Sequence, residues 1–271
     1  MVEFIDADTA PTRNTGQVRL YGPEGFAGMR AAGSLVAACL DELESLIVPG
    51  MTTQAIDDHV LAFAARHDVV PATLYYRGYR KASCTSVNHV VCHGIPAQKA
   101  LKEGDVVNVD VTFIKDGWHG DSSRMYRVGT VRRAAERLLN VTLKALAIGV
   151  AQVKPGNTTG DIGAAIQAYV EGERCSVVRE FCGHGVGLLF HDMPNILHYG
   201  RPGDGVRLQP GMIFTIEPMV NLGRPHVKVL SDGWTAVTRD RSLSAQYEHS
   251  VGVTEDGCEI FTASSHMIAR N

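Results

Sequence analysis

The chain repeats two short passages of its own sequence, and both repeats occur at nearly the same spacing. The passage Pro49–Thr53 returns as Pro155–Thr159, and an isoleucine follows each copy three residues later. The passage Leu101–Asp110 is echoed by Leu208–Glu217, so the two offsets are 106 and 107 residues. Such a repeat restricts the fold more than any single motif does, because each copy forms the same structural unit. The sequence therefore predicts two related halves.

The sequence around the repeats predicts the same order of elements in both halves. Apolar residues recur every three or four positions from Gly25 to Val48 and again from Ile56 to about His67, the spacing of a helix face. Two further helices are expected near residues 131–152 and 159–172. The second passage of each half reads as a glycine turn followed by a β-rich run. The order helix, helix, strands thus occurs twice, which predicts an α+β fold whose halves share one sheet layer.

Composition is that of an ordinary folded protein and points to no polyanionic partner. Of the 271 residues, 45% are hydrophobic and 20% are charged, a balance that argues against disorder, collagen-like repeats and coiled coil. The formal net charge is −3, so we expect no nucleic-acid partner and no membrane surface as partner. No apolar run reaches the roughly 18 residues that a membrane span needs.

The first 20 residues differ from the rest of the chain. They are polar and lack periodicity, so we expect a flexible lead-in over residues 1–20 and a single domain over residues 21–271. The N-terminus carries acidic residues where a signal peptide needs cations. The six cysteines are scattered without a Cys-x-x-Cys pair, which favours reduced thiols. A cytoplasmic location is predicted.

Four carboxylates close or interrupt apolar, strand-like runs, where unpaired acids are rarely found. Asp110 and Glu217 end the two echoed passages, and pseudo-symmetry would bring them together. Asp121 follows a turn at residues 115–117, which would fold its strand back beside that of Asp110. Glu248 lies in another strand-like segment. Acids that converge from several strands predict a metal site.

Two divalent cations bridged by carboxylates would balance four acids better than one cation could. An oxygen-rich ligand set with few nitrogens suits Co, Mn, Fe(II) or Zn. His184 offers the nitrogen ligand, because glycines on both sides let the backbone approach closely and leave the imidazole projecting. His191 follows seven residues later. The residues alone do not decide which cation binds.

Several motifs resemble those of the short bacterial, type I methionine aminopeptidases, a family with the pita-bread metallopeptidase fold. The resemblance covers roughly residues 22–264 and implies two pseudo-symmetric halves with a central antiparallel sheet covered by helices. The passages that carry it are Asn88–Pro96, Val109–Val111, Trp118–Met125, Cys182–Gly185, Phe190–His191, Phe214–Pro218 and Gln246–His249.

The resemblance implies a complete set of metal ligands. Asp110 would chelate one ion, and His184 and Glu217 would bind the other. Asp121 and Glu248 would bridge the two. A hydroxide shared by two cations is nucleophilic near neutral pH, since a metal lowers the pKa of bound water to about 7. Peptide attack would then need no serine or cysteine.

The implied activity is removal of the N-terminal methionine from nascent proteins whose second residue is small, by attack on the first peptide bond. Glu217 would accept the water proton, while His93 and His191 would bind the substrate and stabilise the tetrahedral intermediate. Which histidine faces the oxyanion is left open. The resemblance also implies a monomer, and a transient contact with the ribosome would suit an enzyme that meets nascent chains.

The side chain of the substrate methionine needs an apolar pocket that selects by shape and by soft contacts with its sulfur. The resemblance assigns the lining to Tyr76, Tyr79, Cys84, Phe190 and Trp234, with His93 and His191 crowding the next residue. Four positions depart from the usual family pattern, and these differences are expected to affect catalytic efficiency and the range of substrates. They are Thr73, Tyr75, His89 and Asp192.

Two other classes of function compete with this interpretation. A prolidase or Xaa-Pro aminopeptidase would share the five ligands, but such relatives usually carry a large additional N-terminal domain. A non-catalytic binding module with the same fold would be expected to have lost ligands, and all five are present here. A panel of short peptides separates the three.

Overall fold

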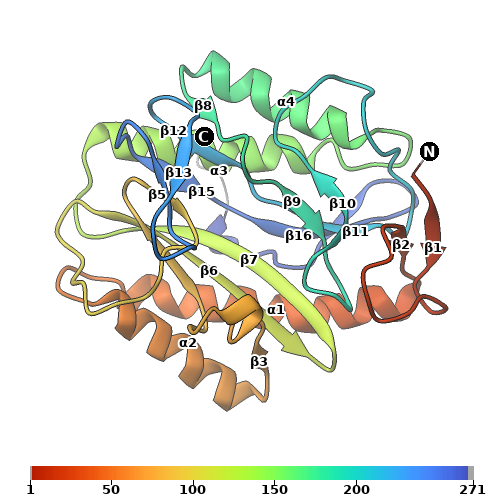
Figure 1. Ribbon diagram of the computed structural model, residues 1–271, viewed down its shortest axis with the longest axis horizontal. Helices are drawn as coiled ribbons and strands as arrows, with labels where there is room; N and C mark the ends of the chain where they lie inside the picture. The colour runs from red at the N-terminus through yellow and green to blue at the C-terminus, as the bar shows by residue number, and fades with distance from the viewer. Residues whose placement is uncertain (1, 268–271) are drawn as a thin grey trace.

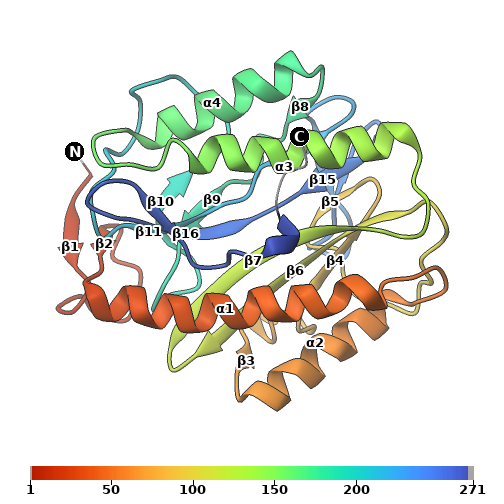
Figure 2. The same cartoon turned by 180° about the vertical axis from the view of Figure 1, so that it is seen from behind.

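A computed structural model describes residues 2–267 (Figures 1 and 2). Within this range the helices α1 (Pro23–Leu46) and α2 (Thr53–His67) lie along one side of the strands. The helices α3 (Arg133–Val150) and α4 (Thr159–Gly172) lie along the other side. These are the four helices that the periodicity predicts, and the α+β class is confirmed. None of the described helices is both long enough and apolar enough to cross a membrane.

Short strands make up most of the middle layer, with one long hairpin among them. The hairpin consists of β6 (Val106–Lys115) and β7 (Trp118–Arg127). The other strands are β1 (Phe4–Asp6), β2 (Val18–Leu20), β3 (Val70–Pro71), β4 (Cys84–Val87), β5 (Val90–Cys92), β8 (Ser176–Val177), β9 (Gly183–Gly185), β10 (Asp192–Ile196), β11 (Ile213–Ile216), β12 (Met219–Asn221), β13 (Val227–Val229), β14 (Ala236–Thr238), β15 (Ser244–Gln246), β16 (His249–Val253) and β17 (Cys258–Ile260).

The largest sheet has the order β1-β2-β10-β9-β11-β16-β17 and belongs mainly to the second half. Its strands pair antiparallel except at the edge, where β2 runs parallel to both β1 and β10. In the first half β6 pairs antiparallel with β3, β4 and β7. Two three-stranded sheets, β15-β12-β8 and β13-β14-β5, complete the layer. Strands β11 and β6 hold equivalent places in the two halves.

In each half, the first repeated passage is hydrogen-bonded to the second. The N–H of Gly50 donates to the carbonyl of Leu101 over 2.8 Å, and the N–H of Gly156 donates to the carbonyl of Leu208 over 3.1 Å. The following helix begins alike in both halves, since Thr52 and Thr158 are the N-caps of α2 and α4. The repeat in the sequence is thus a repeat of the same contact, as the predicted two-fold organisation requires.

Each half also has a hydrophobic core of its own. Fully buried side chains of the first helix pair, such as Leu40 and Phe63, pack with Phe113 of β6. In the second half Leu138 and other residues of α3 and α4 pack with Phe214 of β11. Apolar burial of this kind is the main stabilising contribution to a fold. The helix faces predicted from spacing are therefore the faces that cover the strands.

Two expectations about local structure need correction. Asp110 does not end its strand, because β6 continues through five further residues to Lys115. The pleat lets Asp110 point away from the core while its neighbours Val109 and Val111 pack into it. The first 20 residues, expected to form a flexible lead-in, contain the short strands β1 and β2. These strands form through pairing with distant residues, which local sequence periodicity does not reveal.

Candidate active site

The hairpin of the first half places two aspartates on one face. Thr112 pairs with Asp121 across the two strands, and Asp110 lies two residues before Thr112 on the same side of β6. The Thr112 hydroxyl donates to Asp121 Oδ1 over 2.7 Å. The tight turn between the strands has left-handed backbone at Asp116 (φ 49°) and Gly117 (φ 86°), as the predicted hairpin requires.

The second half supplies two glutamates from the ends of a strand pair. Ile216 of β11 pairs antiparallel with His249 of β16. Glu217 directly follows Ile216 and Glu248 directly precedes His249, so the register carries both glutamates to the same end of the two strands. Strand β11 ends at Ile216, and the ladder cannot continue past Glu217 because Pro218, two positions further on, has no N–H.

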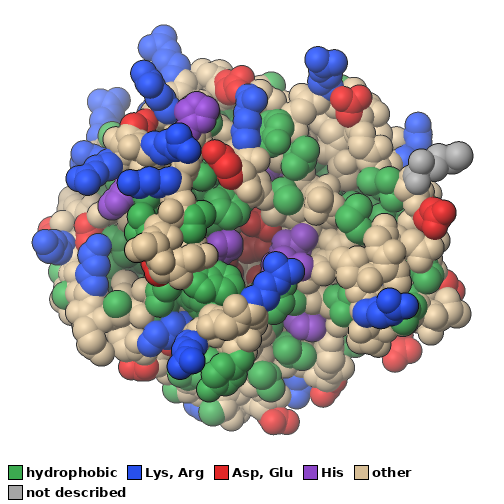
Figure 3. Space-filling model, in the orientation of Figure 1, with side chains coloured by type: hydrophobic (Ala, Val, Ile, Leu, Met, Phe, Trp, Pro, Cys, Tyr) green, Lys and Arg blue, Asp and Glu red, His purple; other side chains and the backbone are tan. Residues whose placement is uncertain are grey.

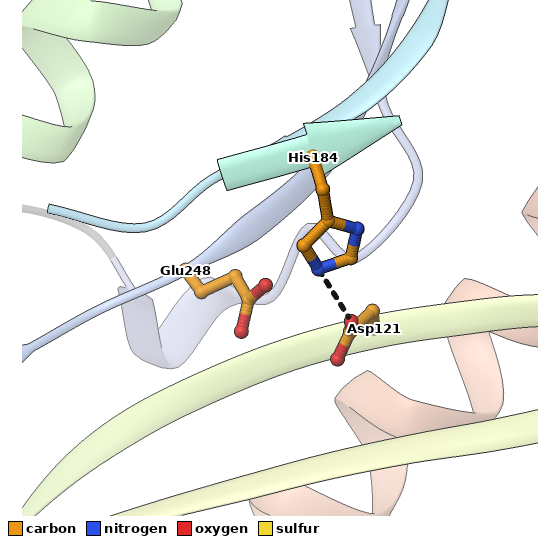
Figure 4. A group of neighbouring side chains, drawn as sticks. All are labelled: Asp121, His184 and Glu248. Atoms are coloured by element: carbon orange, nitrogen blue, oxygen red, sulfur yellow. Dashed lines mark ion pairs between the residues drawn. The ribbon is translucent and has the colours of Figure 1, made fainter. Parts of the chain in front are cut away.

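His184 stands on β9, between the two pairs of acids. Its Nε2 atom lies 3.6 Å from Asp121 Oδ2 and 3.7 Å from Glu217 Oε1. Figure 4 shows its ring directed at Asp121, with the carboxylate of Glu248 beside them. One ligand atom from each of these three residues lies within 4.8 Å of the others. The sequence echo and the topology together thus bring the two halves to a common point.

The glycines beside His184 are required by close packing. A Cβ atom at Gly183 would clash with the carbonyl of Thr215 on β11, and one at Gly185 would clash with the carbonyl of Met193 on β10. Only glycine lets β9 lie this close to both neighbouring strands. The His184 ring is oriented by Nδ1, which is 3.0 Å from the carbonyl of Gly185.

The electrostatics of this group favour a cation. Asp121, Glu217 and Glu248 are at most 8% exposed, and Asp110 is half-buried. Removal from water raises the pKa of Asp110 to about 7. Burial, and then the charges of the neighbouring acids, raise the pKa values of the other three well above their usual range.

Burial also lowers the pKa of His184 to about 4, so its imidazole is neutral at pH 7. Among the described residues, no lysine or arginine forms an ion pair with the four carboxylates. Four clustered acids and a neutral imidazole without a basic partner match the donor set of divalent cations. The residues present therefore fit the metal that the sequence predicts.

Side chains that sequence reasoning did not find hold Glu217 in place. The Thr215 hydroxyl donates to Glu217 Oε1 over 2.9 Å, and Gln246 Nε2 donates to Oε2 over 3.1 Å. The Glu217 N–H donates to Nε2 of the fully buried His198 over 3.0 Å. Only Thr215, two residues from Glu217 on the same strand face, could have been found from local spacing. Long-range pairing brings in the others.

A cavity of about 470 Å³ opens above the carboxylates, and Figure 3 shows acidic and histidine side chains at the bottom of the hollow. Every site residue expected from the sequence lines it: Tyr76, Tyr79, Cys84, His93, Asp110, Asp121, His184, Phe190, His191, Glu217, Trp234 and Glu248. Of the four departures from the family pattern, Thr73 and Asp192 line the cavity. Tyr75 and His89 are not part of its wall, and the Tyr75 side chain is exposed.

Aromatic rings form two walls of this cavity. On one side the ring of Trp234 lies 5.0 Å from that of Tyr79 and 6.2 Å from that of His93. On the other side the ring of Tyr76 lies 5.0 Å from Phe190. Cavity residues that the sequence analysis did not single out include Asn14, Arg77, Glu180, Phe181, Cys182, Met219 and Gln246.

The two histidines beside the metal ligands differ in setting. His93 has left-handed backbone (φ 55°), and burial lowers the pKa of its ring. His191 is exposed at the mouth of the cavity, where its ring stacks on that of Tyr76 at 5.2 Å. A left-handed conformation outside glycine is costly and is held by its surroundings, a common feature of functional sites.

Comparison with known proteins identifies the family and agrees with the fold. The model of metallopeptidase family M24 matches residues 27–255, which is most of the chain. The chain therefore belongs to metallopeptidase family M24.

Relatives with high sequence identity indicate which M24 peptidases this chain resembles. "Methionine aminopeptidase" of Rickettsia prowazekii is 52% identical over 91% of this chain and 96% of its own length. That of Escherichia coli (strain K12) is 50% identical over 90% and 94%. The crystal structure of the Rickettsia prowazekii protein covers 91% of this chain and all of its own, with a TM-score of 0.90. Within the M24 family the chain falls among the methionine aminopeptidases.

For the rival class the comparison shows a likeness of fold alone. A prolidase from Pyrococcus furiosus has a TM-score of 0.72 at 19% identity, and this chain covers 66% of that protein. Likeness at this identity says nothing about substrate, because one fold serves many reactions.

Proposed function

We propose that this chain hydrolyses the first peptide bond of nascent polypeptides that begin with methionine and have a small second residue. It acts in the cytoplasm as a monomer, with a transient contact at the ribosome where nascent chains emerge. The observation that carries the proposal is the meeting of four carboxylates and His184, from both halves, at the bottom of an aromatic cavity. The high identity to methionine aminopeptidases supports the choice of substrate.

In this proposal two divalent cations are held by the carboxylates and His184. Asp110 would hold one cation, His184 and Glu217 would hold the other, and Asp121 and Glu248 would serve both. When bound, the cations supply Lewis acidity and make water nucleophilic near neutral pH. Co, Mn, Fe(II) and Zn all suit these donors.

Glu217 accepts the proton of the attacking water. Its two carboxylate oxygens are held by Thr215 and Gln246, so the group keeps one orientation while it takes up and releases the proton.

His93 and His191 bind the substrate beside the reacting bond and donate hydrogen bonds to the developing oxyanion. His93 comes from the wall that contains Trp234, and His191 from the wall that contains Tyr76. Two imidazoles beside the bond leave little room for the second residue of the substrate. A preference for small second residues follows.

The methionine side chain is bound by aromatic rings and a thiol. Tyr79 and Cys84 are buried, and Trp234 packs on Tyr79 edge to face. Contacts between a thioether and aromatic rings are favourable by about 0.3–1.5 kcal/mol each. Thr73, whose hydroxyl donates to the carbonyl of Lys81, makes the pocket slightly more polar.

The test uses metal-stripped protein restored separately with each of the four cations. Release of the first residue is measured from Met-Ala-Ser, Leu-Ala-Ser, Met-Leu-Ser and an Xaa-Pro peptide. The proposal predicts metal-dependent release of methionine from Met-Ala-Ser well above the other three. Preference for the Xaa-Pro peptide would establish the prolidase class instead, and no cleavage with any cation would favour a binding module.

A variant tests the pocket separately from the chemistry. Trp234→Ala should reduce discrimination between Met-Ala-Ser and Leu-Ala-Ser while the metal content stays unchanged, because the ring of Trp234 packs against Tyr79 and His93, which are not proposed metal ligands. An unchanged ratio of kcat/KM for the two peptides would remove Trp234 from the methionine pocket.

A further inference from the structure

The N-terminal segment is built into the wall of the active-site cavity. Strand β2 joins the edge of the large sheet by pairing Val18 with Met193 of β10, two residues after His191. The N–H of Ala7 donates to the carbonyl of Leu20 over 3.0 Å and closes the base of the loop between β1 and β2. Figure 1 shows these strands beside β10 and β11 at one end of the sheet. The loop therefore starts and ends on fixed strands.

One buried arginine ties this loop to the catalytic side of β10. Arg19 is 3% exposed, and its Nε donates to Asp192 Oδ2 over 2.7 Å. Its Nη2 donates to the carbonyls of Pro11 and Arg13 over 2.7 and 2.8 Å. Asp192 directly follows His191 and is 6% exposed. A single guanidinium thus fixes residues 11–13 relative to the residue next to a proposed catalytic histidine.

The residue after this anchor reaches the cavity. Asn14 lines the same cavity as the five proposed metal ligands, as do Met193 and Asn195 of β10. Its Oδ1 accepts the N–H of Gly16 over 2.8 Å, and its Nδ2 amide group remains able to donate hydrogen bonds. An uncharged donor at this place suits a backbone carbonyl, which accepts hydrogen bonds without regard to sequence.

We propose that Asn14 binds the peptide backbone of the substrate beyond the cleaved bond, and that Arg19 is the positioning residue that holds Asn14 at the cavity. The inference rests on the proposed function, since the peptide must enter with its first residue at the metal ligands. The rest of the chain then leaves through the mouth, where His191 is exposed. The N-terminal segment makes the enzyme favour extended peptides over dipeptides.

The test compares two substrates that differ only in length, Met-Ala and Met-Ala-Ser-Ala-Ser-Ala. For Asn14→Ala the ratio of kcat/KM, long over short, should fall about three- to tenfold, the effect of one lost hydrogen bond. The loss should lie in KM rather than kcat. Thr12→Ala, a change in the same loop at an exposed residue outside the cavity wall, is the control and should keep the wild-type ratio.

Arg19 is tested by coupling to Asn14. Arg19→Ala should lower the same ratio, and the double variant should be no worse than the more affected single variant, because both changes remove one contact. Arg19→Lys, which can reach Asp192 but not both carbonyls at once, should give an intermediate ratio. Thermal unfolding checks that each variant is folded. If the arginine variants do not fold, the Asn14→Ala variant still tests the role of Asn14.

The outcomes separate this inference from the proposed function. A wild-type enzyme that cleaves neither peptide contradicts the proposed function. A wild-type enzyme that cleaves both, with an Asn14→Ala ratio equal to that of the wild type, overturns the inference alone. Additive losses in the double variant would overturn the positioning role of Arg19 and leave the role of Asn14 standing.

Discussion

The two halves of the molecule present their carboxylates by different means. In the first half Asp110 and Asp121 lie within a hairpin whose strands are each ten residues long and paired throughout. In the second half β11 has four residues and β16 has five, and Glu217 and Glu248 lie just outside them. The backbone pairing of the hairpin therefore fixes the positions of the two aspartates. The two glutamates lie beyond the last paired residues of β11 and β16, outside the ladder that these strands form.

Hydrogen bonds from side chains compensate for this difference. Glu217 is held by Thr215 and Gln246 at its two oxygens, whereas Asp121 receives one hydroxyl, from Thr112. The two halves thus repeat their helices and strands but position their acids in two ways. The hairpin gives rigid ligands, and the second half gives ligands that depend on their neighbours.

The largest effect is expected from the rigid half. Asp121→Asn should lower kcat/KM on the order of a thousandfold, because it removes a charge shared by both proposed cations. Metal content, measured by elemental analysis, should fall with it. Asp116→Asn is the matched control, since it makes the same change at the exposed turn of the same hairpin, where asparagine accepts the left-handed backbone. Full activity in Asp121→Asn would contradict a bridging role.

Removal of metal should cost the protein stability. The clustered carboxylates repel one another without a cation, and a ligand at 100 times its Kd adds about 2.7 kcal/mol of folding free energy. A chelator should therefore lower the Tm by about 5–10 °C, measured by scanning fluorimetry. The Tm of Asp121→Asn should respond much less. An unchanged wild-type Tm would argue against cation binding at this cluster.

The supporting hydrogen bonds test the comparison directly. Gln246→Ala should lower metal affinity or activity about 10–100-fold, the usual effect of losing a partner of a metal ligand. Thr112→Val should cost less, about tenfold or below, because the hairpin register still holds Asp121. Metal titrations of both variants measure the loss of metal affinity in each, and the two losses are then compared. Equal losses would show that the two halves do not differ in how they hold their ligands.

The smallest effect concerns the helix starts of the two halves. Thr52 caps α2 with one hydrogen bond, to the N–H of Ala55, whereas Thr158 caps α4 within a reciprocal capping box with Asp161. Thr52→Ala should cost about 1 kcal/mol of unfolding free energy, and Thr158→Ala up to about 2 kcal/mol. Urea denaturation measures both. The reverse order would indicate that the box adds nothing here.

Local patterns in the sequence predicted much of this architecture. Helix spacing, the turn at residues 115–117 and the paired repeats indicated four helices, the hairpin and the two-fold organisation, all of which the structure contains. The acids stood out because carboxylates among apolar residues need a partner. Each of these signals spans only a few consecutive residues.

Long-range contacts escaped prediction for the same reason. Asp110 seemed to end its strand, but alternation continues through Val111 and Phe113, which stay buried on the opposite face. The pairing of β2 with β10 and the hydrogen bond from Gln246 to Glu217 join residues distant in the sequence. Neither leaves a periodic signal in the chain, so the N-terminal wall and the support of Glu217 required the structure.

The central claim is that the two halves meet around a pair of cations. Anomalous diffraction from crystals equilibrated with Mn²⁺ tests it most directly. We expect two peaks in the cavity, one contacted by Asp110 and the other by His184 and Glu217, with Asp121 and Glu248 between them. A single peak at saturating metal, or peaks away from these five side chains, would contradict it.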